Sequence, residues 1–272
     1  DNLVLFDWVG IQNFFALFNS NNAIGKQFGS VLTWTLIWAF FATFLNFFAG
    51  TVMAMIINRP STRLKGFWRT VFSLTIAVPQ FVSLLIIRTM FKPEGAVNSF
   101  LMDMGWIETA LPFFTDAMWA RVTIIVINMW VGIPYTVMSV TGILQNIPAE
   151  QYEAARIDGA GWWRQLASIT LPLVKPTLLV AVLFRLLDAL RMFDLPFVLI
   201  GPGKQSVETL SMLAWDESNQ LRYGSASAFA IILFLYVALV AIVFVKLLGA
   251  DVAGTKEMRN LRKASRKAKA RS

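Results

Sequence analysis

The chain has 272 residues, of which 57% are hydrophobic and only 15% are charged, and its mean hydropathy is +0.61. Average soluble domains are about 25% charged, so this composition indicates a membrane protein and argues against a soluble one. Cysteine and histidine are absent, which excludes disulfides and thiolate chemistry and removes the commonest general base and metal ligand. The net charge of +8 is concentrated in residues 59–69 and 256–271, beside apolar stretches, so we expect no nucleic-acid partner.

Five apolar stretches are long enough to cross a bilayer, which takes about 20 residues of helix. None has the two-residue alternation of a barrel strand. The sequence therefore predicts an all-α membrane protein, a polytopic bundle of transmembrane helices. In the first stretch, Asn46 is expected to hydrogen-bond to a neighbouring helix, and the phenylalanine-rich run 40–48 to face lipid. The five stretches cover residues 30–57, 70–91, 122–144, 177–200 and 225–248.

The basic residues indicate which way the chain crosses the membrane. Sixteen of the 24 Lys and Arg residues lie in segments 58–69 and 145–176 and in the tail from residue 246. Positive residues accumulate on the cytoplasmic side. We therefore expect an external segment 1–29, a membrane domain 30–249 that includes the cytoplasmic loop 145–176, and a basic cytoplasmic tail 250–272.

Three further expectations follow from this orientation. An external start at Asp1 leads us to expect at least one span before this residue, a processed N-terminus being the alternative. The external segment 93–120 is long enough for a short helix on the membrane surface, where its aromatic residues belong. The tail 250–272 is expected to contact anionic membrane lipid.

The loop between the third and fourth stretches is too structured for a linker. The loop predicts a short helix over 148–157. Gly159 is expected either to end this helix or to allow another backbone to approach closely. A second short helix is expected over 161–169. Pro172 and Pro176 then mark the return of the chain into the membrane.

The spacing within this loop is specific. It contains Glu-Ala-Ala, three residues, Gly, nine residues, Ile, one residue and Leu-Pro. This pattern resembles the EAA signature of binding-protein-dependent ABC importer permeases. The resemblance implies a coupling helix that sits in a cleft of a separate ATPase, with small residues for tight packing and a carboxylate for a charged contact. The residues it assigns to this contact are Glu153, Ala154, Ala155, Asp158 and Gly159.

The resemblance also implies the partners and the place of the chain. A permease of this kind is not an enzyme and has no cofactor, because ATP is bound by the partner subunits. It lies in the plasma membrane of a bacterium or archaeon, with a second permease, identical or homologous, two ATPase subunits and an external solute-binding protein. Residues 201–206 lack the four-residue spacer of a phosphate-binding loop, so we predict no ATP site in this chain.

Polar residues in the third span suggest where a substrate binds, because they are costly inside a membrane. Asn128, Gly132 and Tyr135 share one helical face. The stretch around them resembles the maltose-type branch of sugar permeases, in which the positions of Asn128, Val131, Gly132 and Tyr135 line the sugar site. The alternative is helix packing at Gly132 and a kink at Pro134.

The fourth predicted span carries four charged residues, which argues against a lipid-facing position. Asp188 can pair with Arg185 or Arg191 at three-residue spacing. The second sugar-contacting cluster of the family falls here, although this chain has charge where uncharged polar or aromatic residues are common. The alternative is an internal ion-pair network. The expected contacts are Phe184, Leu187, Asp188 and Arg191.

The predicted function is uptake of a di- or oligosaccharide such as maltose, maltodextrin or trehalose. One alternative is a permease for another solute, such as glycerol phosphate, which is disfavoured because Asp188 and Asp194 offset Arg185 and Arg191. A channel or a membrane enzyme is a further alternative, but neither explains the coupling loop.

Overall fold

The computed structural model describes residues 8–19, 21–59, 61–204 and 206–248, and all regular structure in these ranges is helical. The predicted fold class is thus confirmed. The predicted basic tail 250–272 lies outside the described residues. In chain order the helices are α1 (Gln12–Phe18), α2 (Ala23–Asn58), α3 (Lys65–Ala77), α4 (Gln80–Met90), α5 (Ala96–Asp103), α6 (Ala117–Gln145), α7 (Ala149–Ile157), α8 (Trp162–Gln165), a π-helical turn (Leu166–Thr170), α9 (Leu171–Leu190), α10 (Asp194–Leu199), α11 (Leu210–Asn219) and α12 (Tyr223–Leu248).

Four helical units among the described residues are long and apolar enough to cross a membrane. They are α2, α6, the unit from α8 through α9, and α12. A fifth crossing is available only if α3 and α4, which meet at an angle of 92°, count as one span. The segment 93–120, which the basic residues predict to be external, contains the expected short helix, α5.

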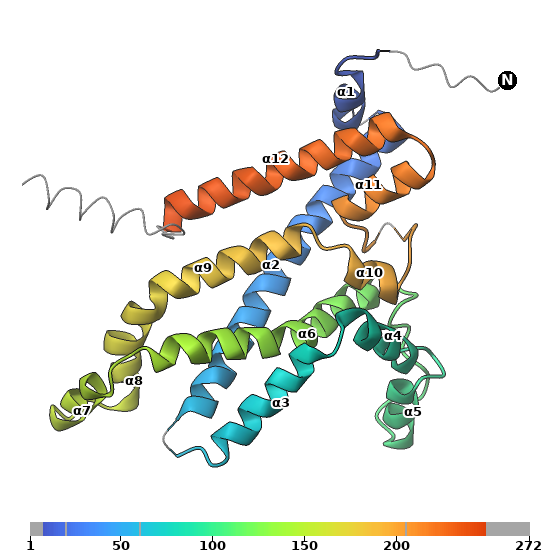
Figure 1. Cartoon of the computed structure of the whole chain (residues 1–272). Helices are drawn as coiled ribbons and strands as arrows, with labels where there is room; N and C mark the ends of the chain where they lie inside the picture. The colour runs from blue at the N-terminus through green and yellow to red at the C-terminus, as the bar shows by residue number, and fades with distance from the viewer. Residues whose placement is uncertain (1–7, 20, 60, 205, 249–272) are drawn as a thin grey trace, which may run out of the picture.

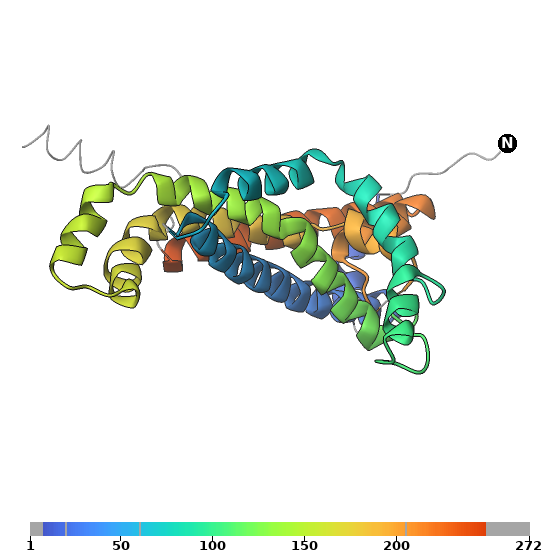
Figure 2. The same cartoon turned by 90° about the horizontal axis from the view of Figure 1, so that it is seen from below.

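The second predicted span, 70–91, is wrong as a continuous helix. It divides into α3 and α4 at Val78 and Pro79, and Val78 has the extended dihedrals φ −76° and ψ 128°. Proline lacks an amide proton and disfavours helical dihedrals in the residue before it, so the helix stops and restarts there. The change of direction carries α4 away from α3 (Figure 2).

The fourth predicted span, 177–200, is wrong at both ends. The helix begins earlier and runs through Pro172 and Pro176, which do not separate loop from span. Pro172 is the second residue of α9 and directly follows the π-helical turn, so it lies where the regular α-helical hydrogen-bond ladder is already altered. The helix then ends at Leu190, so that Arg191 caps it and Asp194 begins the separate helix α10.

The bundle is organised around α2, which crosses α6 and α9 along its length (Figure 1). Trp38 of α2 is fully buried, and its indole Nε1 donates to the carbonyl oxygen of Ala189 at 3.1 Å. This carbonyl belongs to the last turn of α9, and it also accepts from the backbone amide of Met192 at 3.3 Å. Side chains in the phenylalanine run of α2 are exposed and stacked, Phe40 on Phe44 and Phe44 on Phe48.

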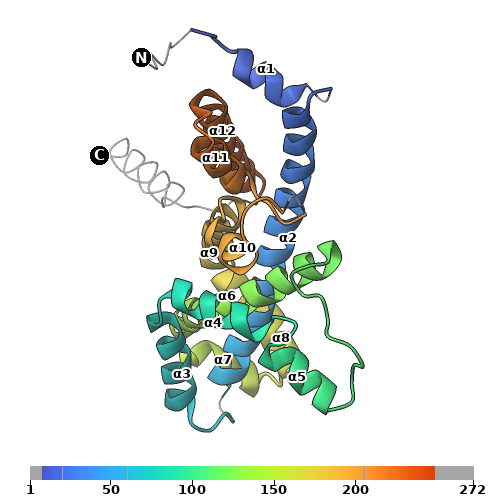
Figure 3. The same cartoon turned by 90° about the vertical axis from the view of Figure 1, so that its right-hand side faces the viewer.

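Helices α7 and α8 form a hairpin beyond the ends of α2, α6 and α9, whereas α1 lies at the opposite end of the bundle (Figure 1). Helix α11 packs against the start of α12, and the two lie beside α2 in the view along the bundle (Figure 3). The fold therefore presents the α7–α8 hairpin at one end and the loops around α4, α5 and α10 toward the other.

The α2–α6 crossing depends on a glycine, which yields a testable prediction. A Cβ at Gly50 would stand 2.6 Å from Cβ and Cγ2 of Thr136, whereas a Cβ at Gly142 of α6 would meet nothing within 4 Å. We expect Gly50→Ala to lower the stability of the solubilised protein by about 1–3 kcal/mol, the usual cost of overpacking. Gly142→Ala is the control and should be neutral or slightly stabilising. Thermal unfolding in detergent measures both, and equal melting temperatures for the two variants would contradict this account of the crossing.

Candidate functional site

A cavity of about 520 Å³ opens where α3 breaks from α4, opposite α6 and α9. Its wall combines aromatic rings, hydroxyl and amide groups, and charged side chains from four helices and the break between two of them. The lining residues are Thr75, Ile76, Val78, Pro79, Gln80, Ser83, Trp130, Val131, Gly132, Tyr135, Phe184, Arg185, Asp188 and Arg191.

Most of the substrate residues expected from the sequence come together in this cavity. Val131, Gly132, Tyr135, Phe184, Asp188 and Arg191 line it. Asn128 does not, because it is buried behind the wall at 1% exposure. Leu187 is also absent from the wall and packs against the apolar core.

Several lining residues were not foreseen. The α3–α4 break contributes Val78, Pro79 and Gln80, and α6 contributes Trp130. A proline in the middle of an apolar stretch was the available signal for the break, because it ends a helix at the residue before it. Trp130 carried no such signal, because tryptophan in a span is ordinary apolar bulk.

The cavity carries more positive charge than the sequence suggested. Arg185 and Arg191 line it together with a single carboxylate, Asp188, whereas Asp194 is exposed on α10 and is not part of the wall. The expected balance of two acids against two bases is therefore wrong for this site. The reason is the end of α9 at Leu190, which separates Asp194 from the span.

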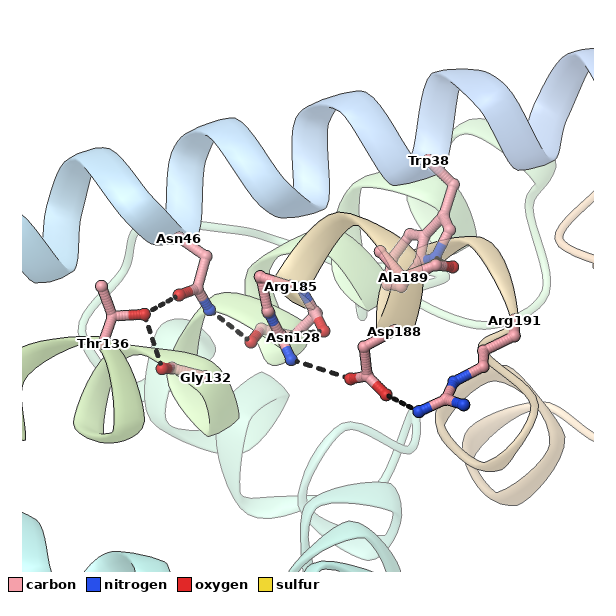
Figure 4. A network of polar contacts seen from close by, with 9 residues as sticks. All are labelled: Trp38, Asn46, Asn128, Gly132, Thr136, Arg185, Asp188, Ala189 and Arg191. Carbon is pink, nitrogen blue, oxygen red and sulfur yellow. Dashed lines mark hydrogen bonds and ion pairs between the residues drawn. The ribbon is translucent and has the colours of Figure 1, made fainter. Parts of the chain in front are cut away.

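A polar network joins α2, α6 and α9 behind the cavity (Figure 4). Arg185 of α9 donates from Nη2 to Oδ1 of Asn128 at 2.8 Å, and the backbone oxygen of Asn128 accepts from Nδ2 of Asn46 at 3.3 Å. The hydroxyl of Thr136 lies 2.7 Å from Oδ1 of Asn46, to which it donates. The expected interhelical hydrogen bond of Asn46 is thus confirmed, and it connects directly to the charged residues.

Asp188 is paired with both neighbouring arginines, as its spacing predicted. Its carboxylate lies 3.3 Å from Nη1 of Arg185 and 3.7 Å from Nη2 of Arg191. The three side chains become steadily more exposed along this chain of contacts, from 17% for Arg185 to 47% for Asp188 and 68% for Arg191. The network therefore leads from the bundle interior to the open cavity, and its outer members are accessible to a solute.

Gly132 leaves room for this network. A Cβ at this position would collide with the amide of Asn46 and stand 2.6 Å from Nη2 of Arg185. Helix α6 continues through Pro134 without interruption. Gly132 therefore has the helix-packing role that the sequence analysis gave as the alternative to a sugar contact. The same residue also lines the cavity.

The second predicted site, the coupling loop, forms helix α7 and the turn after it. The predicted helix 148–157 is observed with Pro148 as its N-cap. Gly159 has φ +73°, a left-handed conformation that favours glycine, and a Cβ there would meet nothing within 4 Å. Gly159 therefore ends the helix and does not serve close packing within this chain. Of the five coupling residues, Glu153, Ala154, Asp158 and Gly159 are exposed and Ala155 is half-buried.

Helix α7 is tied to the base of α9. The hydroxyls of Tyr152 and Thr170 lie 2.8 Å apart, and Thr170 ends the π-helical turn that runs directly into α9. The second short helix expected over 161–169 is thus observed as α8 and this turn, continuous with the span. Among the described residues, no group of three or more acidic, histidine or cysteine side chains is placed to hold a metal ion.

The buried network gives a test of its energetics. We expect Asn128→Leu to lower stability by about 1–3 kcal/mol, because the buried guanidinium of Arg185 loses its 2.8 Å acceptor. The double variant with Arg185→Met should recover part of this loss, since removing both partners leaves no unpaired charge. Thermal unfolding of the wild type, both single variants and the double variant measures the coupling. Strictly additive effects would show that the two side chains do not depend on each other.

Comparison with known proteins gives relatives over nearly the whole chain. The galactooligosaccharides transport system permease protein GanP of Bacillus subtilis is 33% identical over 249 residues, 88% of this chain and 59% of that protein. The maltodextrin transport system permease protein MalC of Streptococcus pneumoniae is 32% identical over 266 residues, 90% of this chain and 60% of the relative. The chain thus spans about 60% of the length of these two relatives.

A solved structure has the same fold. A bacterial ABC transporter involved in the import of the acidic polysaccharide alginate superposes with a TM-score of 0.75 at 25% identity, over 89% of this chain and 82% of the other. Residues 46–253 match the family described as the binding-protein-dependent transport system inner membrane component. This match includes the coupling loop and both sides of the cavity, and the chain belongs to this family of membrane permease components.

Proposed function

We propose that this chain is a permease subunit of an ATP-driven ABC importer that carries an oligosaccharide through the cavity at the α3–α4 break. The observation that carries the proposal is the wall of that cavity. It sets the rings of Trp130, Tyr135 and Phe184 beside the ion-paired Asp188 and Arg191. Aromatic faces suit the apolar faces of sugar rings, and charged groups make strong hydrogen bonds to hydroxyls. The galactooligosaccharide and maltodextrin permeases among the relatives support this cargo class.

The coupling role rests on the exposure of α7. Its residues Glu153, Ala154 and Asp158 are free of the bundle, and its Tyr152 is bonded to Thr170 at the base of α9. A movement of α7 imposed by an ATPase would therefore reach α9, which carries Arg185 and Asp188. The complete machine then has two ATPase subunits that bind ATP, a second homologous permease and an external solute-binding protein. Rigid-body motion of this kind is how alternating access is produced.

The orientation belongs to the same proposal. Helix α7 and the tail 250–272 lie on the cytoplasmic side of the plasma membrane and segment 1–29 lies outside, as the distribution of basic residues favours.

A second candidate cargo is an anionic solute, such as an acidic oligosaccharide or glycerol phosphate. The observation that favours it is the excess of one guanidinium over carboxylate in the cavity wall, where Arg191 is 68% exposed. The structural relative imports an acidic polysaccharide. Stimulation of ATPase activity by neutral and by uronic oligosaccharides, measured side by side in the reconstituted complex, separates the two candidates.

Tyr135 provides a test of the cavity. We expect Tyr135→Ala to raise the half-saturating solute concentration about tenfold, which corresponds to roughly 1.4 kcal/mol of lost ring contact. Val126→Ala, on an exposed part of α6 away from the cavity wall, is the control and should leave uptake unchanged. Uptake by proteoliposomes is the measurement, with co-purification of the ATPase as the check on assembly. Equal uptake by both variants would show that the solute does not pass through this cavity.

Gly159 provides a test of the coupling loop. We expect Gly159→Leu to lower solute uptake per ATP hydrolysed, because φ +73° penalises a side chain and the new bulk meets the ATPase surface. Gly161→Leu is the matched control, since Gly161 has φ −67° and equal free space. Parallel assays of uptake and hydrolysis decide the matter. A complex that purifies without any ATPase would contradict the importer proposal as a whole.

A further inference from the structure

A second cavity, of about 440 Å³, lies at the opposite end of the membrane domain from the loops of α4 and α10. It is formed where α2 and α6 end, beneath the hairpin of α7 and α8. None of its lining residues belongs to the cavity at the α3–α4 break. It therefore needs an explanation of its own.

The uncharged polar groups in this cavity are already satisfied within the chain. Asn58 donates to the carbonyl oxygen of Ala54 and to Thr141 and accepts from Arg69. Tyr152 and Thr170 bond to each other, and Gln165 donates to the carbonyl oxygen of Ala160 at 2.7 Å. These groups shape the cavity and leave its charged residues as the ones that can recognise a ligand.

Two arginines remain. The guanidinium of Arg59 lies over the ring of Trp162, 4.7 Å from its centroid, and Arg156 donates from Nε to the carbonyl oxygen of Tyr152 at 3.2 Å. Stacking on a ring and a single Nε bond leave the terminal nitrogens of a guanidinium able to donate. No carboxylate lines the cavity, and neither arginine forms an ion pair with any of the described residues. The site thus holds two positive charges that nothing in the described part of the chain neutralises.

The rest of the wall is apolar. Met55, Leu144 and Leu166 line the cavity beside these two charges. The site also lies at the ends of spanning helices, the depth at which lipid headgroups meet the chain, and it contains Trp162 and Tyr152, side chains typical of that level. A ligand that fits both halves of the site has an anionic head and an apolar tail.

We propose that this cavity binds an anionic phospholipid, with its phosphate at Arg59 and Arg156 and an acyl chain along Met55, Leu144 and Leu166. Basic pockets between membrane helices are known to suit such headgroups. The bound lipid links the end of α2 to α7, since the two arginines come from these two segments. It stabilises the position of the coupling hairpin against the bundle, whatever solute the protein carries.

The test uses the full chain with the subunits that purify with it. The complex is reconstituted in nanodiscs of phosphatidylglycerol and phosphatidylcholine, and the lipids retained after mild delipidation are identified by native mass spectrometry. We expect wild-type protein to retain phosphatidylglycerol preferentially. The double variant Arg59→Gln/Arg156→Gln should lose that preference about 25-fold, because each cation near an anionic headgroup contributes a factor of about five. Arg63→Gln is the matched control. Like Arg59, Arg63 is an exposed arginine in the connection between α2 and α3, but it does not line the cavity, so this variant should keep the preference.

Further arms distinguish the alternatives. Met55→Trp fills the apolar part of the cavity, keeps both arginines and should also lose the lipid. If the double variant fails to fold, this second variant still tests the proposal. Equal retention by the double variant and by Arg63→Gln would overturn the proposal. So would equal retention of the two lipids by wild type, or displacement of phosphatidylglycerol by inorganic phosphate alone, which would make the site one for free phosphate.

Discussion

The burial of one guanidinium organises the middle of this protein. The side chain of Arg185 is 17% exposed inside the helical bundle, where an unpaired charge is costly. Its partners come from its own helix and from α6, and the backbone of Asn128 in turn accepts from Asn46 of α2. The charge therefore joins α9 to α6 through the side chain of Asn128, and the backbone of the same residue joins α6 to α2. The same requirement keeps Gly132 free of a side chain, since a Cβ there would collide with Asn46 and approach Arg185.

The two ends of α9 serve the two sites. At one end, the π-helical turn and the Tyr152–Thr170 hydrogen bond hold the coupling hairpin. Toward the other, Arg185 and Asp188 form the charged wall of the cavity. The helix between them is continuous from Leu171 to Leu190. Under the proposed function, a rigid element with a site near each end is a simple mechanical link between an ATPase and a solute, because packed helices move as bodies and do not deform gradually.

Sequence reasoning predicted the helical class, the short helix over 148–157 and its end at Gly159, because these depend on local signals of composition, spacing and backbone conformation. Six of the eight expected substrate residues line the cavity, since a three- or four-residue spacing fixes which side chains share a face. It failed where tertiary context decides. Whether Pro79 breaks a span while Pro134 and Pro176 do not depends on which neighbours replace the lost hydrogen bonds. The displacement of Asp194 from the cavity followed from one such misplaced helix end.

If the cavity is the solute path proposed above, the break at Val78 and Pro79 bears on how the solute is held. Where a helix stops, its last carbonyl groups and the first amide protons of the next helix have no partner within the helices. The residues on both sides of this break, Thr75, Ile76 and Gln80 among them, line the cavity. Under the proposed function, a main-chain group left unpaired at the break would offer a hydrogen bond to a solute hydroxyl, and substitution of the side chains would not remove that bond. Such a bond would persist in every side-chain variant of the cavity, whereas the contacts of the side chains themselves would change.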